Sequence, residues 1–315
     1  MPVRRRLLLA ALAALALSPA PFAFAQPWPA KTVRIIVPFP PGGGADTLAR
    51  VMGPHLTRIW GQPVVVENKP GASGHIGADM VAQSPADGYT LLMASTAALS
   101  EKNVRSFAPA TLVSASAYVI VANPRLKANT VKELIAEAKA APGKFSFGSS
   151  GTGAASHLSG ELFAAMSGIK LLHVPYKGTG QAVTDLLAGQ IDLMFAPAQT
   201  AMPHVQAGKL KALAVTSAKR ASTLPNLPTA AESGLPGYEA LGWFGLLAPA
   251  ATPKAIVEKV SADANAVLAL PEVKERLLGL GAEPSGNKPD EFAAFIRDDQ
   301  AKWAKLMNEL GIKPE

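Results

Sequence analysis

The strongest chemical signal in the chain is the run Pro-Phe-Pro-Pro-Gly-Gly-Gly-Ala-Asp at residues 38–46, which lies between a predicted strand and a predicted helix. Its three glycines let the backbone turn sharply and let a ligand approach the main chain. The unpaired amides at the helix start, helped by the helix dipole, form a site for an anion. We expect Phe39, Gly42 and Gly43 to contact a negatively charged ligand. Asp46 either joins this site or caps its own helix.

A second loop of the same kind, Gly-Ser-Ser-Gly-Thr-Gly at residues 148–153, also separates a predicted strand from a predicted helix. Here we expect Ser149, Gly151 and Thr152 to offer hydroxyls and amides, with His157 one turn into the helix as a further donor or a structural histidine. Either loop alone is equally well explained as a tight turn, because short glycine patterns are common. Together they predict two anion-binding walls that face each other, beyond the carboxyl ends of strands.

Weaker candidates lie at the ends of other predicted strands. Ser73 lies in a glycine-containing loop that is equally well explained as a plain turn. Ser95 and Thr96 follow one strand, and Tyr176 ends another. Asp192 lies inside an apolar strand, where a buried carboxylate needs a partner, and a structural hydrogen bond is its simplest role.

Searches for catalytic and metal-binding patterns find nothing. The chain has no Gly-x-Ser-x-Gly elbow, no His-Glu-x-x-His motif, no P-loop and no complete dinucleotide fingerprint. Its five histidines lack metal-ligand spacing, and no carboxylate pair is placed for acid–base work. We therefore predict a binding protein with no catalytic residue, no metal and no cofactor.

The elements that must position these loops alternate between short apolar runs and amphipathic stretches. The apolar runs are expected to be buried strands, at residues 33–37, 64–66, 91–93, 119–121, 145–147, 171–174, 191–195 and 213–215. Between them, helical spacing at residues 48–59 and 131–138 predicts helices, the second behind a capping box of Thr130 and Glu133. This β-α-β-α order predicts α/β domains with mostly parallel sheets. Three helices, opening near Pro253, Pro271 and Pro289, are expected at the C-terminal end.

Two domains are expected from the length of the chain and from two candidate crossings. Asn123-Pro124 and the proline- and glycine-rich stretch at residues 224–237 are typical of interdomain connections. One domain would then contain residues 26–122 and 240–315, and the other residues 123–239. Two neighbouring crossings make a hinge, with the cleft between the domains.

The N-terminus predicts export. Arg4, Arg5 and Arg6 precede an apolar run at residues 7–17 and the small-residue pattern Ala23-Phe24-Ala25, which together indicate a signal peptide at residues 1–25. Its removal would lower the formal charge from +7 to +4, since the segment holds three arginines and no acidic residue. The remaining lysines are scattered, so no nucleic-acid partner is expected. The chain has no cysteine, and its stability must come from buried apolar area.

With these loops in place, the sequence resembles the Bug/TctC family, the substrate-binding proteins of tripartite tricarboxylate transporters. The resemblance covers nearly the whole mature chain, and the stretches that carry it lie at residues 28–29, 37–46, 66–74, 84–90, 148–157, 174–178, 185–195 and 228–234. It implies a type II periplasmic binding protein fold, with a carboxylate-bearing solute held between the domains by amides, hydroxyls and water. It also implies a periplasmic location, membrane transporter subunits as partners and a di- or tricarboxylate or aromatic acid as ligand. We expect a monomer.

Two departures from the family pattern bear on the ligand. Residues 101–106 are shorter than the usual stretch at this place, which packs near the cleft. The strand ending at Phe195 continues with Ala196-Pro197, where many members have an acidic or amide residue that can pair with an ammonium group. We therefore expect a plain organic acid rather than an amino acid. The alternatives are a binding protein that signals to a membrane sensor kinase and, less favoured, a periplasmic hydrolase that uses a serine of the second loop.

Overall fold

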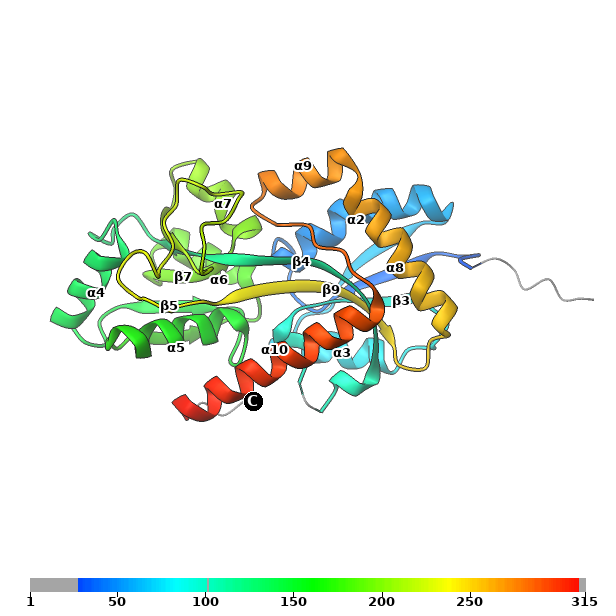
Figure 1. The fold of residues 1–315 in the computed structure, drawn as a ribbon, viewed down its shortest axis with the longest axis horizontal. Coiled ribbons are helices and arrows are strands. Elements are labelled where there is room, and N and C mark those ends of the chain that lie inside the picture. The colour runs from blue at the N-terminus through cyan, green and yellow to red at the C-terminus, as the bar shows by residue number, and fades with distance from the viewer. Residues whose placement is uncertain (1–27, 101, 312–315) are drawn as a thin grey trace, which may run out of the picture.

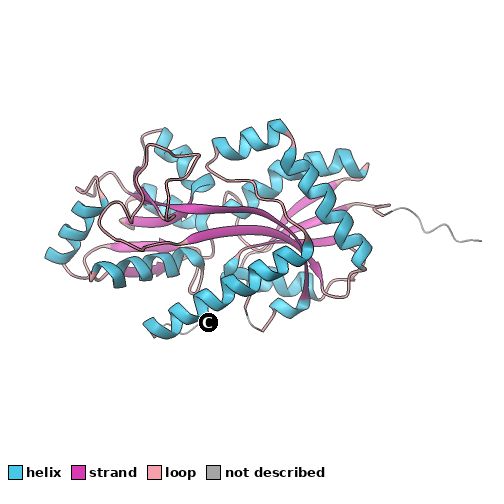
Figure 2. Cartoon of the chain, in the orientation of Figure 1, coloured by secondary structure: helices cyan, strands magenta, loops and turns pink. Residues whose placement is uncertain are grey.

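The computed structural model describes residues 28–100 and 102–311, so the predicted signal peptide lies outside the described part. The strands are β1 (Val33–Val37), β2 (Val64–Asn68), β3 (Thr90–Ala94), β4 (Phe107–Ala122), β5 (Ser146–Ser149), β6 (Leu172–Pro175), β7 (Leu193–Pro197), β8 (Lys211–Val215) and β9 (Leu241–Pro249). The α-helices are α2 (Gly44–Trp60), α3 (His75–Ala82), α4 (Val131–Ala140), α5 (Ala155–Ser167), α6 (Thr179–Ala188), α7 (Ala198–Gln206), α8 (Lys254–Ala269), α9 (Pro271–Gly279) and α10 (Pro289–Leu310). Helices cover both faces of the sheet, which confirms the predicted α/β class (Figure 2).

The strands form one sheet in the order β2-β1-β3-β9-β4-β7-β5-β6, with β8 paired to β4. β1 pairs in parallel with β2 and β3, and β5 with β6 and β7. By contrast, β4 and β9 run antiparallel to each other and to their other neighbours. The sheet is therefore mixed, not mostly parallel as expected, because the two long strands that cross the molecule run in opposite directions.

The molecule has two lobes that lie side by side along its long axis (Figure 1). The first lobe contains β1–β3 with α2, α3, α8 and α9, and the second contains α4–α7 with β5–β8. In the first lobe one apolar core surrounds β1 and β3, while in the second lobe two cores lie on the two faces of the sheet. Each lobe thus buries its own apolar residues, as a separate folding unit does.

Three segments connect the lobes: β4, β9 and α10 (Figure 1). β4 pairs with β9 from Phe107 to Ala117 and with β7 from Tyr118 onward, so the chain passes between the cores within one strand. The stretch at residues 224–237 contributes Ala230 and Leu235 to a core of the second lobe. The predicted domain boundaries at 122/123 and 239/240 remain a prediction.

Local sequence signals account for several helix ends. The N-cap expected before α4 is present, since the Glu133 amide donates to Thr130 Oγ1 at 3.2 Å, but the Glu133 carboxylate accepts from the Asn129 amide at 2.7 Å and so completes only half of the predicted capping box. α2 begins after Gly43 in an extended conformation and ends at Gly61 in the left-handed region, where glycine avoids the Cβ clash. None of the described helices is long and apolar enough to cross a membrane.

Candidate functional site

The two glycine loops lie where the lobes meet. A Cβ placed on Gly43 would lie 2.9 Å from Thr179 Oγ1 of the second lobe, and one on Gly180 would lie 2.9 Å from the Pro41 carbonyl oxygen. A Cβ on Gly151 would lie 3.0 Å from the Cβ of Ser73 in the first lobe. Each loop therefore touches the opposite lobe at distances that only glycine permits, so both loops lie at the interface between the lobes.

Asp46 holds the first loop in shape. Its carboxylate accepts hydrogen bonds from the Gly42 amide at 3.0 Å, from Arg50 Nε at 2.9 Å and from Asn68 Nδ2 at 2.9 Å. Burial by itself would raise the pKa of Asp46, but the hydrogen bonds from Arg50, Gly42 and Asn68 outweigh it and hold that pKa below its ordinary value. The Gly42 amide is thus already occupied, and Asp46 orders the loop from within.

The second loop is also partly occupied by its own hydrogen bonds. The Gly151 amide donates to Ser149 Oγ at 3.2 Å, and the Gly153 amide donates to His157 Nδ1 at 3.1 Å. Ser149 Oγ also lies 2.6 Å from His173 Nε2, and the His157 and His173 rings stack with centroids 3.9 Å apart. These contacts give the loop one fixed shape.

The amides that remain available are those of the helix starts. Among the described residues, the amides of Gly43, Gly44 and Ala45 have no acceptor, and neither has the amide of Thr152. The start of α6 is a feature that the sequence analysis missed: Thr179 and Gly180 lie directly against the first loop, so the positive ends of α2 and α6 approach one another across the cleft. Two such ends attract an anion more strongly than one.

The weaker candidates are placed in different ways. Ser73 is buried at the contact with the second loop, and Ser95 is half-buried at the end of β3. The hydroxyls of Thr96 and Tyr176 donate to Asp299 and Asp185, at 3.1 and 2.8 Å. Asp192 accepts from the Ser146 amide at 2.8 Å. The structure therefore gives Thr96, Tyr176 and Asp192 internal partners, and their role as ligand contacts stays a prediction.

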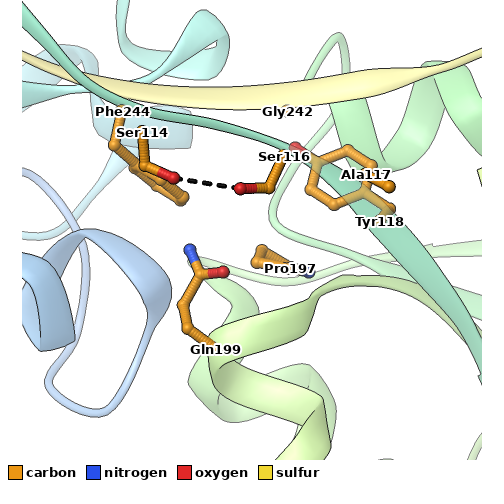
Figure 3. Close-up of a pocket in the computed structure, with 8 residues that line it drawn as sticks. All are labelled: Ser114, Ser116, Ala117, Tyr118, Pro197, Gln199, Gly242 and Phe244. Atoms are coloured by element: carbon orange, nitrogen blue, oxygen red, sulfur yellow. Dashed lines mark hydrogen bonds between the residues drawn. The ribbon is translucent and has the colours of Figure 1, made fainter. Parts of the chain in front are cut away.

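Between the lobes, the connecting strands line a narrow and closely packed pocket, which we call the cleft floor (Figure 3). Its lining residues, of which only Pro197 was singled out from the sequence, come from β4, β7, α7 and β9: Ser114, Ser116, Ala117, Tyr118, Pro197, Gln199, Gly242 and Phe244. A Cβ placed on Gly44 would lie 2.6 Å from Gln199 Nε2, so the floor adjoins the start of α2. No local motif could reveal this pocket, because its walls come from three segments, at residues 114–118, 197–199 and 242–244, that lie far apart in the sequence.

The Ser149–His173 pair is the nearest approach to a nucleophile in the described part of the chain. Ser149 is fully buried, and its hydroxyl also lies 3.1 Å from the Gly151 carbonyl oxygen. Burial, and then the neighbouring His157 ring, lowers the pKa of His173 to about 4, so this imidazole is a weak base. No carboxylate among the described residues hydrogen-bonds to His173 to orient it, and no metal-binding group of His, Cys, Asp or Glu occurs there. The pair fits a structural role.

The fold, with its cleft between two lobes, is that of an α/β periplasmic binding protein. Residues 48–312 match the tripartite tricarboxylate transporter family receptor, TctC, and the chain belongs to this family. BugT of Bordetella pertussis is 38% identical over 300 residues, which cover 92% of this chain and 92% of BugT. Among solved structures, R. palustris Rpa4515 with adipate superposes with a TM-score of 0.87 at 34% identity and covers 91% of this chain and 100% of its own. MatC (Rpa3494) from Rhodopseudomonas palustris with bound malate gives a TM-score of 0.83 at 30% identity, with coverages of 89% and 99%.

Proposed function

We propose that this protein is exported to the periplasm, captures a small organic dicarboxylate between its two lobes and delivers it to a tripartite membrane transporter. The observation that carries the proposal is that each of two glycine loops, one from each lobe, contacts the opposite lobe, and that helix starts beside these contacts have unpartnered amides. An anion at these amides adds contacts to both lobes at once and so favours the closed arrangement. The proposal includes a hinge between two domains, one formed by residues 26–122 and 240–315 and the other by residues 123–239.

The ligand class follows from charge and from the relatives. Every residue that lines the cleft floor is neutral, and the end of β7 offers only Ala196 and Pro197, so an ammonium group would find no carboxylate there. Related proteins have been solved with adipate and with malate. We therefore favour a dicarboxylate without an amino group, bound without turnover.

The remaining parts of the proposal concern partners and location. The signal peptide at residues 1–25 would be cleaved on export, leaving a monomer that binds no cofactor and no nucleic acid. The closed form would present to the transporter a surface made by both lobes, because the relative orientation of the two lobes is fixed only in that form.

The experiment that tests this function is a thermal-shift screen of the mature protein, followed by isothermal titration of the hits. The panel holds mono-, di- and tricarboxylates together with aspartate and glutamate. We expect a dicarboxylate to raise the melting temperature, because a ligand that binds the native state stabilises it. Tighter binding of aspartate or glutamate than of every dicarboxylate would reject the ligand class, and no binding of any carboxylate would reject the function.

A further inference from the structure

The cleft floor contains a buried carbonyl oxygen with no hydrogen-bond partner. Gln199 lies at the start of α7, is 4% exposed and points its carboxamide toward the connecting strands (Figure 3). Its Oε1 is buried without a partner among the described residues. A buried acceptor without a partner is unfavourable, so its retention calls for a donor that arrives from outside the chain.

The neighbouring polar groups do not supply that donor. The hydroxyls of Ser114 and Ser116 hydrogen-bond to each other at 3.0 Å, and Ser116 Oγ also accepts from the Glu283 amide at 2.8 Å. These serines therefore satisfy one another. Gln199 is left with a free acceptor and, on Nε2, donor hydrogens without an acceptor among the described residues.

The carboxamide is well placed to meet a ligand held at the helix starts. Its Nε2 lies against Gly44, the first residue of α2, so it adjoins the unpartnered amides of Gly43 and Gly44. It also belongs to the second lobe, which brings it against the first lobe only when the lobes approach. Gln199 is thus a neutral group beside the anion site that can both accept and donate one hydrogen bond.

A hydroxyl is a ligand group that can give a hydrogen to the unpartnered Oε1 and also accept one from Nε2. A second carboxylate has no hydrogen to give to Oε1, and an ammonium group would be placed in a pocket whose lining carries no negative charge. We propose that Gln199 is a specificity-determining residue that selects hydroxy-substituted dicarboxylates, with a carboxylate at the start of α2 and the hydroxyl on its carboxamide. This inference rests on the proposed function and adds the substrate class to it.

The test compares malate with succinate, which differ by one hydroxyl, in isothermal titrations of the wild type and of Gln199→Met. Methionine has a similar length and no comparable donor or acceptor. We expect the wild type to bind malate at least tenfold more tightly than succinate, since a lost hydrogen bond that leaves a buried group unpaired is worth about 1.4 kcal/mol or more. Gln199→Met is expected to lose most of this preference while its affinity for succinate changes by less than about threefold.

The control is Gln206→Met, an exposed change at the far end of α7 that should leave the preference unchanged. Equal wild-type affinities for malate and succinate would overturn the inference, and so would an undiminished preference for malate in Gln199→Met. Both outcomes leave carboxylate binding intact and are therefore distinct from failure of the proposed function, in which neither ligand binds. A melting temperature of the ligand-free variant close to that of the wild type excludes misfolding as the cause.

Discussion

His173 shows how one residue connects the second glycine loop to the stability of the second lobe. It is half-buried on β6, stacks on His157 and lies within hydrogen-bond distance of Ser149, the second residue of the loop at residues 148–153. The charged groups around it are few: Glu161 on α5 lies 3.5 Å from His157 Nε2 and opposes the lowering of the pKa of His173. The neutral imidazole is therefore the form that the folded protein accommodates.

A pH dependence of stability follows from this arrangement. The pKa of His173 is about 4 in the folded protein and about 6.5 in an unfolded chain, so the unfolded state takes up the proton first as the pH falls. Stability contributed by this residue is complete above pH 6.5 and is lost as the pH falls toward 4. We expect His173→Gln, which keeps a polar partner for Ser149, to show a smaller decline in melting temperature over this interval. Parallel declines in the two proteins would contradict the prediction.

Among the elements, α10 has the most unusual position because it packs on both lobes (Figure 1). Its first half places Phe292 and Ile296 in the first core, and its second half places Trp303 in a core of the second lobe. Between them, the partly buried carboxylate of Asp299 accepts hydrogen bonds from Trp243 Nε1 on β9 at 2.7 Å and from Trp303 Nε1 at 2.9 Å. Asp299 thus ties the helix to a strand that connects the lobes.

Removal of this carboxylate should destabilise the protein. Asp299→Ala leaves two buried indole N–H groups and the Thr96 hydroxyl without an acceptor, and we expect a loss of about 3 kcal/mol in the free energy of unfolding. Asp299→Asn keeps one carbonyl oxygen and should lose less. Urea unfolding measures the free energy of unfolding of both variants. The control is Asp298→Ala, a change at the exposed neighbouring residue, whose free energy of unfolding should lie within about 0.5 kcal/mol of that of the wild type. If the urea midpoint of Asp299→Ala equals that of the wild type, the hydrogen bonds of Asp299 do not stabilise the packing of α10 against β9.

At the scale of the whole molecule, the proposed function requires that ligand binding and closure of the lobes occur together, and the lobes are in direct contact in this structure. The contacts at Gly43, Gly151 and Gly180 leave no room for a side chain, so closure depends on glycine at positions far apart in the sequence. Of these, Gly43 is the most informative to change, because its φ of −79° is allowed for any residue. A substitution at Gly43 therefore tests whether a side chain fits between the lobes, and it adds no backbone strain.

We expect Gly43→Val to fold with nearly wild-type stability and to lose at least tenfold in affinity for its carboxylate, because the new side chain meets Thr179 before the lobes close. Small-angle scattering should show the wild type contracting on ligand addition and the variant unchanged. Gly279→Val is a matched control, since a Cβ at that position meets no atom within 4 Å. The double variant Gly43→Val with Thr179→Gly should recover part of the affinity; wild-type affinity in Gly43→Val alone would contradict this view of closure.

The strands that the sequence analysis missed show what limits prediction from local patterns. β9 contains Gly242, Gly245 and Pro249, which weaken any strand signal. In the folded chain the two glycines are needed because Tyr118 and the Phe292 ring pack against them. Similarly, only the end of the 16-residue strand β4 was expected, since its middle alternates serine with small residues that pack between the lobes.

The sequence by itself determined the α/β class, most of the short buried strands and the two glycine loops, because hydrophobic periodicity, turns and helix starts depend on residues that are close together in the chain. It also carried enough long motifs to indicate the family. Only the tertiary structure decided that the sheet is mixed, that α6 faces α2, and that Gln199 lies beside the loop at Gly43. These features depend on pairing between segments that are distant in the chain, and such pairing is set by packing across the whole molecule rather than by local preference.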